Sequence, residues 1–431
     1  MNKKILLVLT DGFPYGGGEP WLEDEQHYWH GFDRIYVAPI QLPQNAKVGV
    51  HRNLATGIKI LMPVATNKIA RYKALLRYGI WRHDLRQELF MLLKTGRLNQ
   101  ARVCSALGLV ADSWLQASSI LRQLHQDGLS TNDEVVCYAY WMYKPAYTAV
   151  LLSEAIPMAS CVTRCHRYDI YEERNVMSYL SMRTSIFSCM QKIFCICKQG
   201  RNYLREHYQF DYTKIAIAHL GSNDYGVQNY QRKKNSFNIV SCSNLIPVKR
   251  VHLIADGVKL FANRQPDVKV QWTHYGAGEL REELWKRAVN NSPQNLSVKF
   301  AGALPHEELL KRMSSSKGTD IFINSSSSEG VPVSIMEALS MGIPALAPDV
   351  GGISELIHDS RNGYLLNADL TAEEIATVLE RIYLLPDEQY MSLRAGAREV
   401  WQMAWNAAAN YQAFADGLAE LIKRNVRRKC V

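Results

Sequence analysis

The chain lacks any hydrophobic run long enough to cross a membrane. No window of its 431 residues approaches the roughly 18 consecutive apolar residues that a spanning helix requires. The start, from Met1 to Asp11, has too short an apolar core for a secretory signal, so we expect a cytosolic chain. Internal repeats and low-complexity tracts are also missing. The 47% hydrophobic and 21% charged content excludes disordered, collagen-like and coiled-coil proteins.

The chain has only a small excess of positive charge and an odd number of cysteines. Lys and Arg number 50 against 41 Asp and Glu, a surplus of 9 that is unevenly placed. The nine cysteines are odd in number and lie mostly in apolar runs, which favours reduced thiols in a cytosolic protein. The Cys161-x3-Cys165-His166 motif has no second ligand pair at zinc-like spacing, so we expect no metal site.

The apolar pattern divides the chain into two α/β halves. A buried strand at 5–9, a Gly-rich loop, a helix from Trp21 and a second strand at 34–40 open the first half. After a polar break at 231–236, the same alternation restarts near Phe237. We predict Rossmann-like domains at 1–230 and 237–395, and a helical segment at 396–431 that returns to the first domain. Ligands of parallel sheets bind at the carboxyl ends of the strands, and interdomain clefts are common sites for small molecules.

The densest motif runs from Ser325 to Leu339. Glu329 precedes a predicted helix, and Glu337 follows eight residues later on a similar face. The helix N-terminus can bind anionic oxygens, and Gly330 allows the backbone to approach a ligand closely. Two carboxylates beside an anion site fit a polyhydroxylated phosphate ester. The alternative is a solvated glutamate at the helix start with a surface glutamate further on.

This motif resembles the E-x7-E signature of retaining GT-B glycosyltransferases of family 4. The strand before it (320–324), the segments after it (342–346 and 351–357) and the Asn362-Gly363 turn are also similar to that family. The resemblance implies that Glu329 contacts the donor sugar and that Glu337 holds the ribose of the nucleotide. The backbone near the donor sugar and phosphates would then be that of Gly330, Val331, Pro332 and Val333.

A second similarity covers residues 243–250, where the family has an Arg and a Lys that neutralise the donor diphosphate. Lys249 matches the Lys, whereas Asn244 stands in place of the Arg. Arg250 stands where the family has Gly, and we expect it to supply the missing charge. Gly276 lies in a Gly-x-Gly turn that is expected to shape the nucleotide pocket. A basic pair on the surface is the alternative for 249–250.

The first half carries fewer matches. Gly16 and Gly17 precede Glu19 in a loop that resembles the family's Gly-Gly-x-Glu donor loop, although a plain turn is the alternative. The resemblance places His166 near the reacting sugar and assigns Asp169 to the acceptor side, with a structural histidine as the alternative. Tyr140 and Trp141 can pack against an acceptor sugar or belong to the core.

Residues 68–102 hold most of the surplus positive charge. This stretch contains nine Lys and Arg residues but only two acidic residues, and aromatic and aliphatic residues are interleaved with them. Such a basic amphipathic stretch suits an anionic membrane surface. A solvated helical face is the alternative, and no nucleic-acid motif is present.

The resemblance implies a retaining glycosyltransferase that moves a sugar from a nucleotide-sugar to a hydroxyl of a glycan, which is expected to be lipid-linked. The process it implies is the synthesis of capsule, exopolysaccharide or lipopolysaccharide, with the enzyme in the cytoplasm or peripheral on the inner face of the membrane. No Asp-x-Asp motif is present, and no metal or other cofactor is expected. The alternatives are another GT-B enzyme, such as a sugar-nucleotide epimerase, and a non-enzymatic membrane-associated binding protein.

Overall fold

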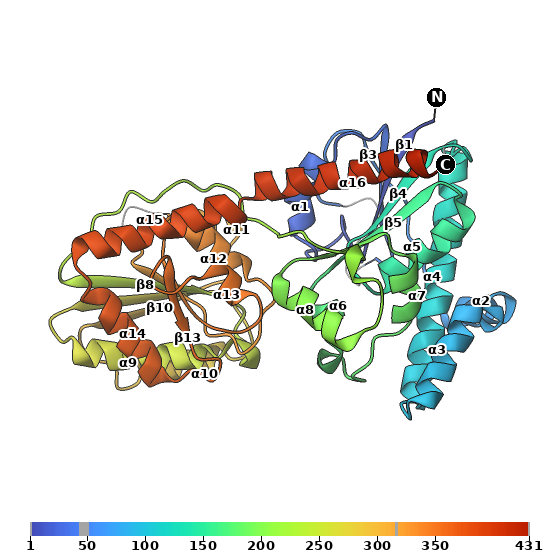
Figure 1. The fold of residues 1–431 in the computed structure, drawn as a ribbon. Coiled ribbons are helices and arrows are strands. Elements are labelled where there is room, and N and C mark those ends of the chain that lie inside the picture. Colours follow the sequence, from blue (N-terminus) through green and yellow to red (C-terminus); the bar gives the residue numbers. More distant parts are fainter. Residues whose placement is uncertain (1, 43–50, 315–317, 430–431) are drawn as a thin grey trace. The chain divides into compact units, whose positions relative to one another are not determined.

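The chain forms two compact units, each described here by itself (Figure 1). The computed structural model describes residues 2–42, 51–314 and 318–429, with the backbone alone for 423–429. Unit 1 comprises Met1–Ala218 and Tyr411–Val431, and unit 2 comprises His219–Asn410. The chain therefore leaves unit 1, builds unit 2, and returns to unit 1.

Unit 1 is built on a seven-stranded parallel sheet in the order β3-β2-β1-β4-β5-β6-β7. The order runs outward from β1 and β4 in opposite directions, so a topological switch point lies between these two strands. Leu9 pairs with Ala38 of β2 and Ala139 of β4. The strands are β1 (Lys4–Thr10), β2 (Arg34–Pro39), β3 (Ile58–Ile60), β4 (Glu134–Ala139), β5 (Ala159–Cys165), β6 (Lys192–Cys195) and β7 (Ile215–Ile217).

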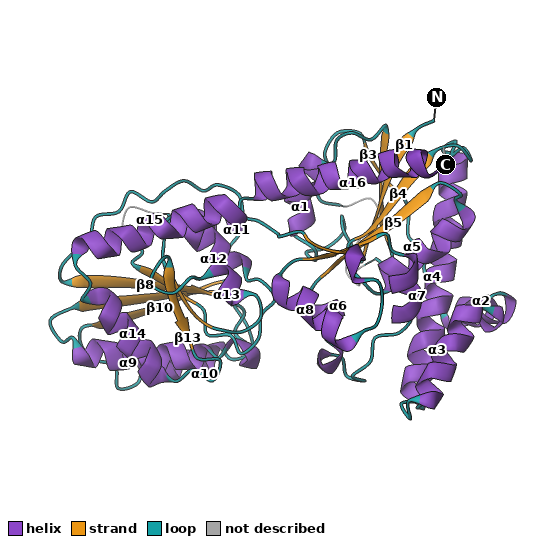
Figure 2. Cartoon of the chain, viewed as in Figure 1, coloured by secondary structure: helices purple, strands orange, loops and turns teal. Residues whose placement is uncertain are grey.

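Helices cover both faces of this sheet (Figure 2). They are α1 (Trp21–Glu25), α2 (Lys68–Arg77), α3 (His83–Lys94), α4 (Gln100–Gln126), α5 (Lys144–Ala155), α6 (Arg167–Ile170), α7 (Arg183–Cys189), α8 (Lys198–His207) and α16 (Ala407–Lys429). Single 3₁₀ turns are η1 (Gln26–Tyr28), η2 (Gly79–Trp81), η3 (Glu172–Arg174) and η4 (Tyr212–Lys214). No helix in the described part of the chain is long and apolar enough to span a membrane.

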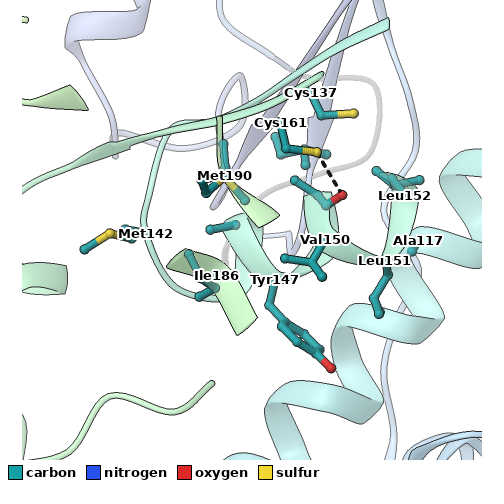
Figure 3. Close-up of a cluster of buried hydrophobic side chains, with 14 of the residues drawn as sticks. Ala117, Cys137, Met142, Tyr147, Val150, Leu151, Leu152, Cys161, Ile186 and Met190 are labelled. Carbon is teal, nitrogen blue, oxygen red and sulfur yellow. Dashed lines mark hydrogen bonds between the residues drawn. The ribbon is translucent and has the colours of Figure 1, made fainter. Parts of the chain in front are cut away.

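The alternating side chains of β1 divide the core of unit 1 into two layers. Leu7 and its neighbours at 5 and 9 pack with α4, α5 and α7, in the cluster that includes Tyr147 and Ile186 (Figure 3). Leu6 and Val8 face the opposite way and pack against α1 and α16. The C-terminal helix α16 is therefore part of this second layer.

The stretch at 68–126 contains three α-helices, α2, α3 and α4. Asn67 and Asn99 each accept a backbone N–H three residues on, which caps the starts of α2 and α4. The 3₁₀ turn η2 separates α2 from α3, and Gly96 has a φ of 67° between α3 and α4. The breaks come from these caps and glycines, because the apolar pattern itself continues across them.

Unit 2 has a six-stranded parallel sheet in the order β10-β9-β8-β11-β12-β13, with its switch point between β8 and β11. The strands are β8 (Ser236–Cys242), β9 (Lys269–Tyr275), β10 (Leu296–Gly302), β11 (Ile321–Ile323), β12 (Ala345–Pro348) and β13 (Gly363–Leu366). The 3₁₀ turn η5 spans Pro247–Lys249. The helices are α9 (Val251–Arg264), α10 (Arg281–Val289), α11 (His306–Met313), α12 (Val333–Ser340), α13 (Ile353–Leu356), α14 (Ala372–Tyr383) and α15 (Asp387–Ala404).

The boundaries of unit 2 differ from the predicted 237–395. The Ser222 backbone exchanges hydrogen bonds with Trp405 and Ala407, and the Gln228 side chain accepts from Arg394 at 3.0 Å. These bonds attach the segment before the polar break to α15, so both belong to unit 2. The predicted segment 396–431 is also divided, because α15 ends at Ala404 and α16 begins at Ala407.

Candidate functional site

The loops after β8 and β11 meet at the switch point of unit 2. The Lys249 ammonium lies 2.5 Å from Oε1 of Glu329, and the same oxygen accepts the Asn324 amide at 3.4 Å. Glu329 is buried, and about a fifth of the Lys249 side chain is exposed. A cation and a carboxylate that were 80 residues apart in the sequence therefore form one pair at the carboxyl edge of the sheet.

The Arg250 side chain points to the β11–α12 loop rather than toward a free site. Its guanidinium donates to the carbonyls of Ser325 (2.8 Å), Ser326 (3.2 Å) and Ala368 (3.0 Å). Arg250 has a φ of 46°, a left-handed backbone conformation that favours glycine. Our expectation that Arg250 replaces the missing phosphate-binding charge is wrong in this geometry, because its donors satisfy loop carbonyls. Asn244, on the preceding loop, is exposed.

Two glycines allow the loops at this edge to pack closely. A Cβ on Gly351 would lie 2.0 Å from the Glu329 carbonyl oxygen, and Gly352 N–H donates to the Gly330 carbonyl at 2.6 Å. A Cβ on Gly276 would lie 1.9 Å from the Ser243 carbonyl oxygen, at a φ of 140°. The loop after β12 thus supports the backbone of Glu329, and Gly276 supports the loop that leads to Lys249.

A buried hydrogen-bond chain supports that same loop. Trp272 Nε1–H donates to Ser241 Oγ (2.9 Å), so the Ser241 hydroxyl donates to His274 Nδ1 (2.9 Å). The remaining ring nitrogen, Nε2, donates to the Ser243 carbonyl at 3.1 Å. Burial lowers the pKa of His274 to about 4, so the ring is neutral at physiological pH.

Glu337 lies one turn into α12 and is buried, with 4% of its surface exposed. Its Oε1 is 2.6 Å from Nε2 of His306, the first residue of α11. Val331 is buried, Pro332 precedes α12, and Val333 is its first residue. Sequence reasoning selected Glu337 but missed His306, because no motif marks that histidine.

In unit 1, the loop after β1 is organised by Glu19. Its carboxylate accepts the backbone N–H groups of Asp11 (2.9 Å), Gly12 (2.9 Å) and Phe13 (2.7 Å). Oε1 also accepts Nε1–H of Trp141, from the loop after β4, at 2.7 Å. The carboxylate therefore joins the two loops on either side of the switch point of unit 1.

A cavity of about 540 Å³ opens at these loops. Gly17 and Trp141 line it, and Gly16 turns the chain beside it with a φ of 66°. Tyr140 has no exposed surface and belongs to the core, so its predicted place on the acceptor side is wrong. Gly18, Glu19 and Tyr143, which the sequence motifs also contain, line the cavity too. Sequence reasoning missed the other lining residues: Asp11, Gly12, Tyr15, Gln41 and Tyr168.

His166 stands at the end of β5 among aromatic rings. Its ring centroid is 4.6 Å from that of Trp141 and 4.7 Å from that of Tyr140. Burial, reinforced by the Arg164 charge, lowers the pKa of His166 to about 3. Its Nε2 has no hydrogen-bond partner within the described part of the chain. The ring is therefore neutral, and its Nε2 is buried.

Asp169 has a different task from the predicted acceptor contact. It is fully buried, and its carboxylate accepts the backbone N–H groups of His166 and Met142, each at 2.6 Å. Burial raises the pKa of Asp169 to about 7. Asp169 therefore fixes the backbone at His166 and at Met142, the residue after Trp141, and in this way positions His166 and Trp141.

The thiols of the Cys161-x3-Cys165 motif face the core. Cys161 Sγ donates to the Ala149 carbonyl at 3.2 Å (Figure 3), and Cys165 Sγ is 3.4 Å from Cys195 Sγ. The eight cysteines in the described ranges are free, and Cys430 lies outside them. Those ranges hold no group of three or more His, Cys, Asp or Glu side chains arranged to bind a metal ion.

Part of unit 2 is similar to a known family. Residues 236–384 match the family of glycosyl transferases group 1. The matched segment includes Lys249, Glu329 and Glu337, together with the loops that join them. No curated protein sequence matches the chain.

Solved structures match the chain over both units. HepE of Anabaena, crystallised with UDP and glucose, is 17% identical with a TM-score of 0.60, covering 97% of this chain and 100% of HepE. Sucrose-phosphate synthase of Thermosynechococcus elongatus is 11% identical with a TM-score of 0.68 (98% and 100% covered). A glycosyltransferase of Rickettsia africae is 14% identical with a TM-score of 0.61 (98% and 100% covered). The predicted GT-B fold, with two Rossmann-like parallel sheets, is confirmed.

Proposed function

We propose that the chain is a retaining glycosyltransferase that moves a sugar from a nucleotide-sugar donor to a hydroxyl of a glycan acceptor. One observation carries the proposal: Lys249 and Glu329 are paired at the switch point of unit 2, inside the segment that matches glycosyl transferases group 1. A buried carboxylate with a cation at this edge suits a ligand that presents both a diphosphate and sugar hydroxyls.

In the proposed reaction, the bond between the sugar C1 and the donor diphosphate breaks as the acceptor oxygen bonds to C1 on the same face. The acceptor proton passes to an oxygen of the leaving diphosphate. Lys249 and the N–H groups at the start of α12 stabilise the charge that develops there. On this proposal no metal ion is required, and a chelator leaves the rate unchanged.

The carboxylates divide the recognition of the donor. Glu329 faces the donor sugar and shares Lys249 with the diphosphate, while Glu337, held by His306, accepts the ribose hydroxyls. The backbone from Gly330 to Val333 approaches the phosphates. HepE was crystallised with UDP and with UDP-glucose, which supports a uridine nucleotide as the first donor to test.

The cavity of unit 1 is the proposed acceptor side. Trp141, Tyr143 and Tyr168 provide faces on which sugar rings pack, and Asp11 and Gln41 offer polar groups to hydroxyls. We extend the proposal to a lipid-linked glycan of the cell surface, such as a precursor of capsule, exopolysaccharide or lipopolysaccharide. The basic segment 68–102 and the family resemblance support this extension, as they support a place in the cytoplasm or on the inner face of the membrane.

Thermal unfolding with UDP, GDP, ADP and CMP tests the donor site. A ligand at 100 times its dissociation constant adds about 2.7 kcal/mol of stability, which gives a clear shift. We expect one nucleoside diphosphate to stabilise the wild type and the exposed-residue control Glu388→Ala, but not Glu337→Ala. No shift with any nucleotide would contradict the donor site and favour a non-enzymatic binding protein.

Product analysis separates transfer from its closest rival. With the stabilising nucleotide's sugar donors, a transferase forms an acceptor-linked sugar whose anomeric configuration equals that of the donor. A sugar-nucleotide epimerase instead converts the donor without any acceptor. We expect Glu329→Gln to abolish sugar transfer while nucleotide binding persists.

A further inference from the structure

Exposed hydrophobic side chains gather in one short part of unit 1. Of the eighteen large hydrophobic side chains that are exposed in the described residues, ten lie between residues 62 and 98. They belong mainly to α2, η2 and α3, and Trp81 is exposed over 71% of its surface. Single exposed hydrophobic residues are ordinary, but a contiguous group marks an interaction surface.

Helix α2 carries an apolar stripe on its outer side. Ile69, Tyr72 and Leu76 are spaced i, i+3, i+7 and are all exposed. Lys73 and Arg77 flank this stripe on one side, and Lys68 lies on the other. The helix contacts α4 with a different face, through Ala74 and an ion pair between Arg71 and Asp112 at 2.6 Å. The stripe is therefore not the side that packs against the core.

The next elements continue the same surface. Ile80 and Trp81 of η2 are exposed, and so are Phe90 and Leu93 on the outer side of α3. Leu85 and Leu92 make the buried side of α3. Exposed Arg86 and Lys94 stand beside Phe90 on the helical wheel. We call this group the hairpin surface: Lys68, Ile69, Tyr72, Lys73, Leu76, Arg77, Ile80, Trp81, Arg86, Phe90, Leu93 and Lys94.

The acidic residues of the same segment point inward. Asp84 is paired with Arg82 at 2.6 Å, and Arg82 also binds Glu154 of α5. Glu88 accepts the Met182 backbone N–H and the Tyr179 hydroxyl. Within the described ranges, none of the five cations of the hairpin surface has an ion-pair partner. The outer side is therefore apolar and uniformly basic.

The hairpin surface is held in place rather than loosely attached. Arg82 joins η2 to α5, and its guanidinium stacks over the Tyr78 ring at 5.2 Å from the centroid. The Asp112 carboxylate on α4 bridges Arg71 of α2 and Lys144 of α5. The fold thus fixes an outward apolar face that it does not use for its own core.

We propose that the hairpin surface docks unit 1 onto an anionic lipid bilayer. The apolar stripes enter the boundary between headgroups and acyl chains, and the five cations meet anionic headgroups. A nucleic acid would use the cations but not the stripe of Ile, Leu and Phe. Trp81 and Tyr72 have the amphipathic rings that favour the bilayer interface.

Vesicle co-sedimentation of the full chain tests this proposal. We expect binding to vesicles that contain phosphatidylglycerol, little binding to pure phosphatidylcholine, and weaker binding as salt screens the charges. Trp81→Ser/Phe90→Ser and Lys73→Glu/Arg77→Glu should each weaken binding about tenfold or more. The matched controls are the exposed unit 2 pairs Leu384→Ser/Met403→Ser and Lys286→Glu/Lys299→Glu, which should bind as the wild type does.

Several outcomes overturn the proposal. If the hairpin variants bind vesicles as well as the controls do, the membrane contact lies outside the hairpin surface. No vesicle binding, with self-association or nucleic-acid binding lost in the hairpin variants, would assign the surface to another partner. A thermal unfolding transition like that of the wild type, measured without nucleotide, reports that each variant is folded. Because vesicle binding needs no donor, its failure and failure of the transferase proposal are observed independently.

Discussion

Nε2 of His306 lies 2.6 Å from Oε1 of Glu337, so a half-exposed histidine holds a carboxylate that is almost fully buried. The pair connects the first residue of α11 to the middle of α12. The second oxygen of Glu337 is thereby oriented by a residue that no sequence motif marks.

Replacing His306 should weaken donor binding more than catalysis. In His306→Ala, Glu337 loses the partner that orients it, and a hydrogen bond to a charged group contributes about 1.5–3 kcal/mol. We expect KM for the donor to rise about tenfold with kcat nearly unchanged. His252→Ala, on α9, is the control. An equal loss in kcat would show that His306 acts in the chemical step instead.

Replacing Lys249 should affect the chemical step. The Lys249→Met variant removes a fixed cation from the site of the leaving diphosphate, where one electrostatic contact is worth about 10²–10³ in kcat. Steady-state kinetics, with Lys286→Met as the control, measures the loss. A variant that raises only KM would show that Lys249 binds the ground state and the transition state equally.

Replacing Arg250 should mainly reduce stability. The Arg250→Met variant leaves the carbonyls of Ser325, Ser326 and Ala368 without their donor, at a cost of about 1–3 kcal/mol. Denaturant unfolding monitors the loss, and donor affinity in the folded fraction should stay within about threefold. A large loss of donor affinity without destabilisation would restore Arg250 as a phosphate ligand.

Acid should destabilise unit 2 through His274. Its pKa is about 4 in the folded chain, below the ordinary 6.5, because burial disfavours the charged ring. The unfolded chain therefore binds a proton that the folded chain does not, so this contribution is complete above pH 6.5 and is lost as the pH falls toward 4. At pH 5 the loss is about 2 kcal/mol.

The variant His274→Gln isolates this effect. It should be less stable at pH 7, because the chain from Trp272 to Ser243 is broken, but its stability should fall less between pH 7 and pH 5, by about 2 kcal/mol. The exposed His125→Gln variant should follow the wild type. Equal pH profiles for all three proteins would exclude His274 as the titrating group.

The buried pair of Glu25 and Arg164 should show a strong coupling in unit 1. Neither side chain has exposed surface, and the guanidinium lies 4.0 Å from the centroid of the Phe414 ring on α16. Glu25→Leu or Arg164→Met alone leaves an unpaired buried charge and should cost about 3–5 kcal/mol. The double variant should cost clearly less than the two losses added together, which urea unfolding can measure.

Local signals predicted much of the fold, because the buried strands are short apolar runs and most are followed by helices. The sequence pattern placed strands at 5–9 and 34–40, close to β1 and β2, and a restart near Phe237, where β8 lies. The pattern missed β3 and β7, which are three residues each and only half-buried. The end of unit 2 was missed because the backbone bonds of Ser222 to Trp405 and Ala407 leave no mark in composition.

Residues of the candidate site could be predicted only where they belong to a sequence motif. Glu329, Glu337 and Lys249 were identified one by one, but their pairing depends on β8 and β11 being neighbours across the switch point. Tyr140 and Trp141 are adjacent in sequence, yet only Trp141 lines the cavity, because side chains alternate at the end of a strand. The direction of Arg250 follows from its left-handed backbone, which the sequence does not reveal.

The return of α16 to unit 1 also fixes an order of events during synthesis. Phe414, Leu418 and their neighbours complete a layer whose other members come from β1, α1 and β4. The ribosome makes those elements first, but some 190 residues of unit 2 must be synthesised before α16 can complete the layer. Unit 2 is a single continuous segment, so it can finish folding while unit 1 still has one face of its sheet uncovered. The half of the protein that is begun first is thus the half that is completed last.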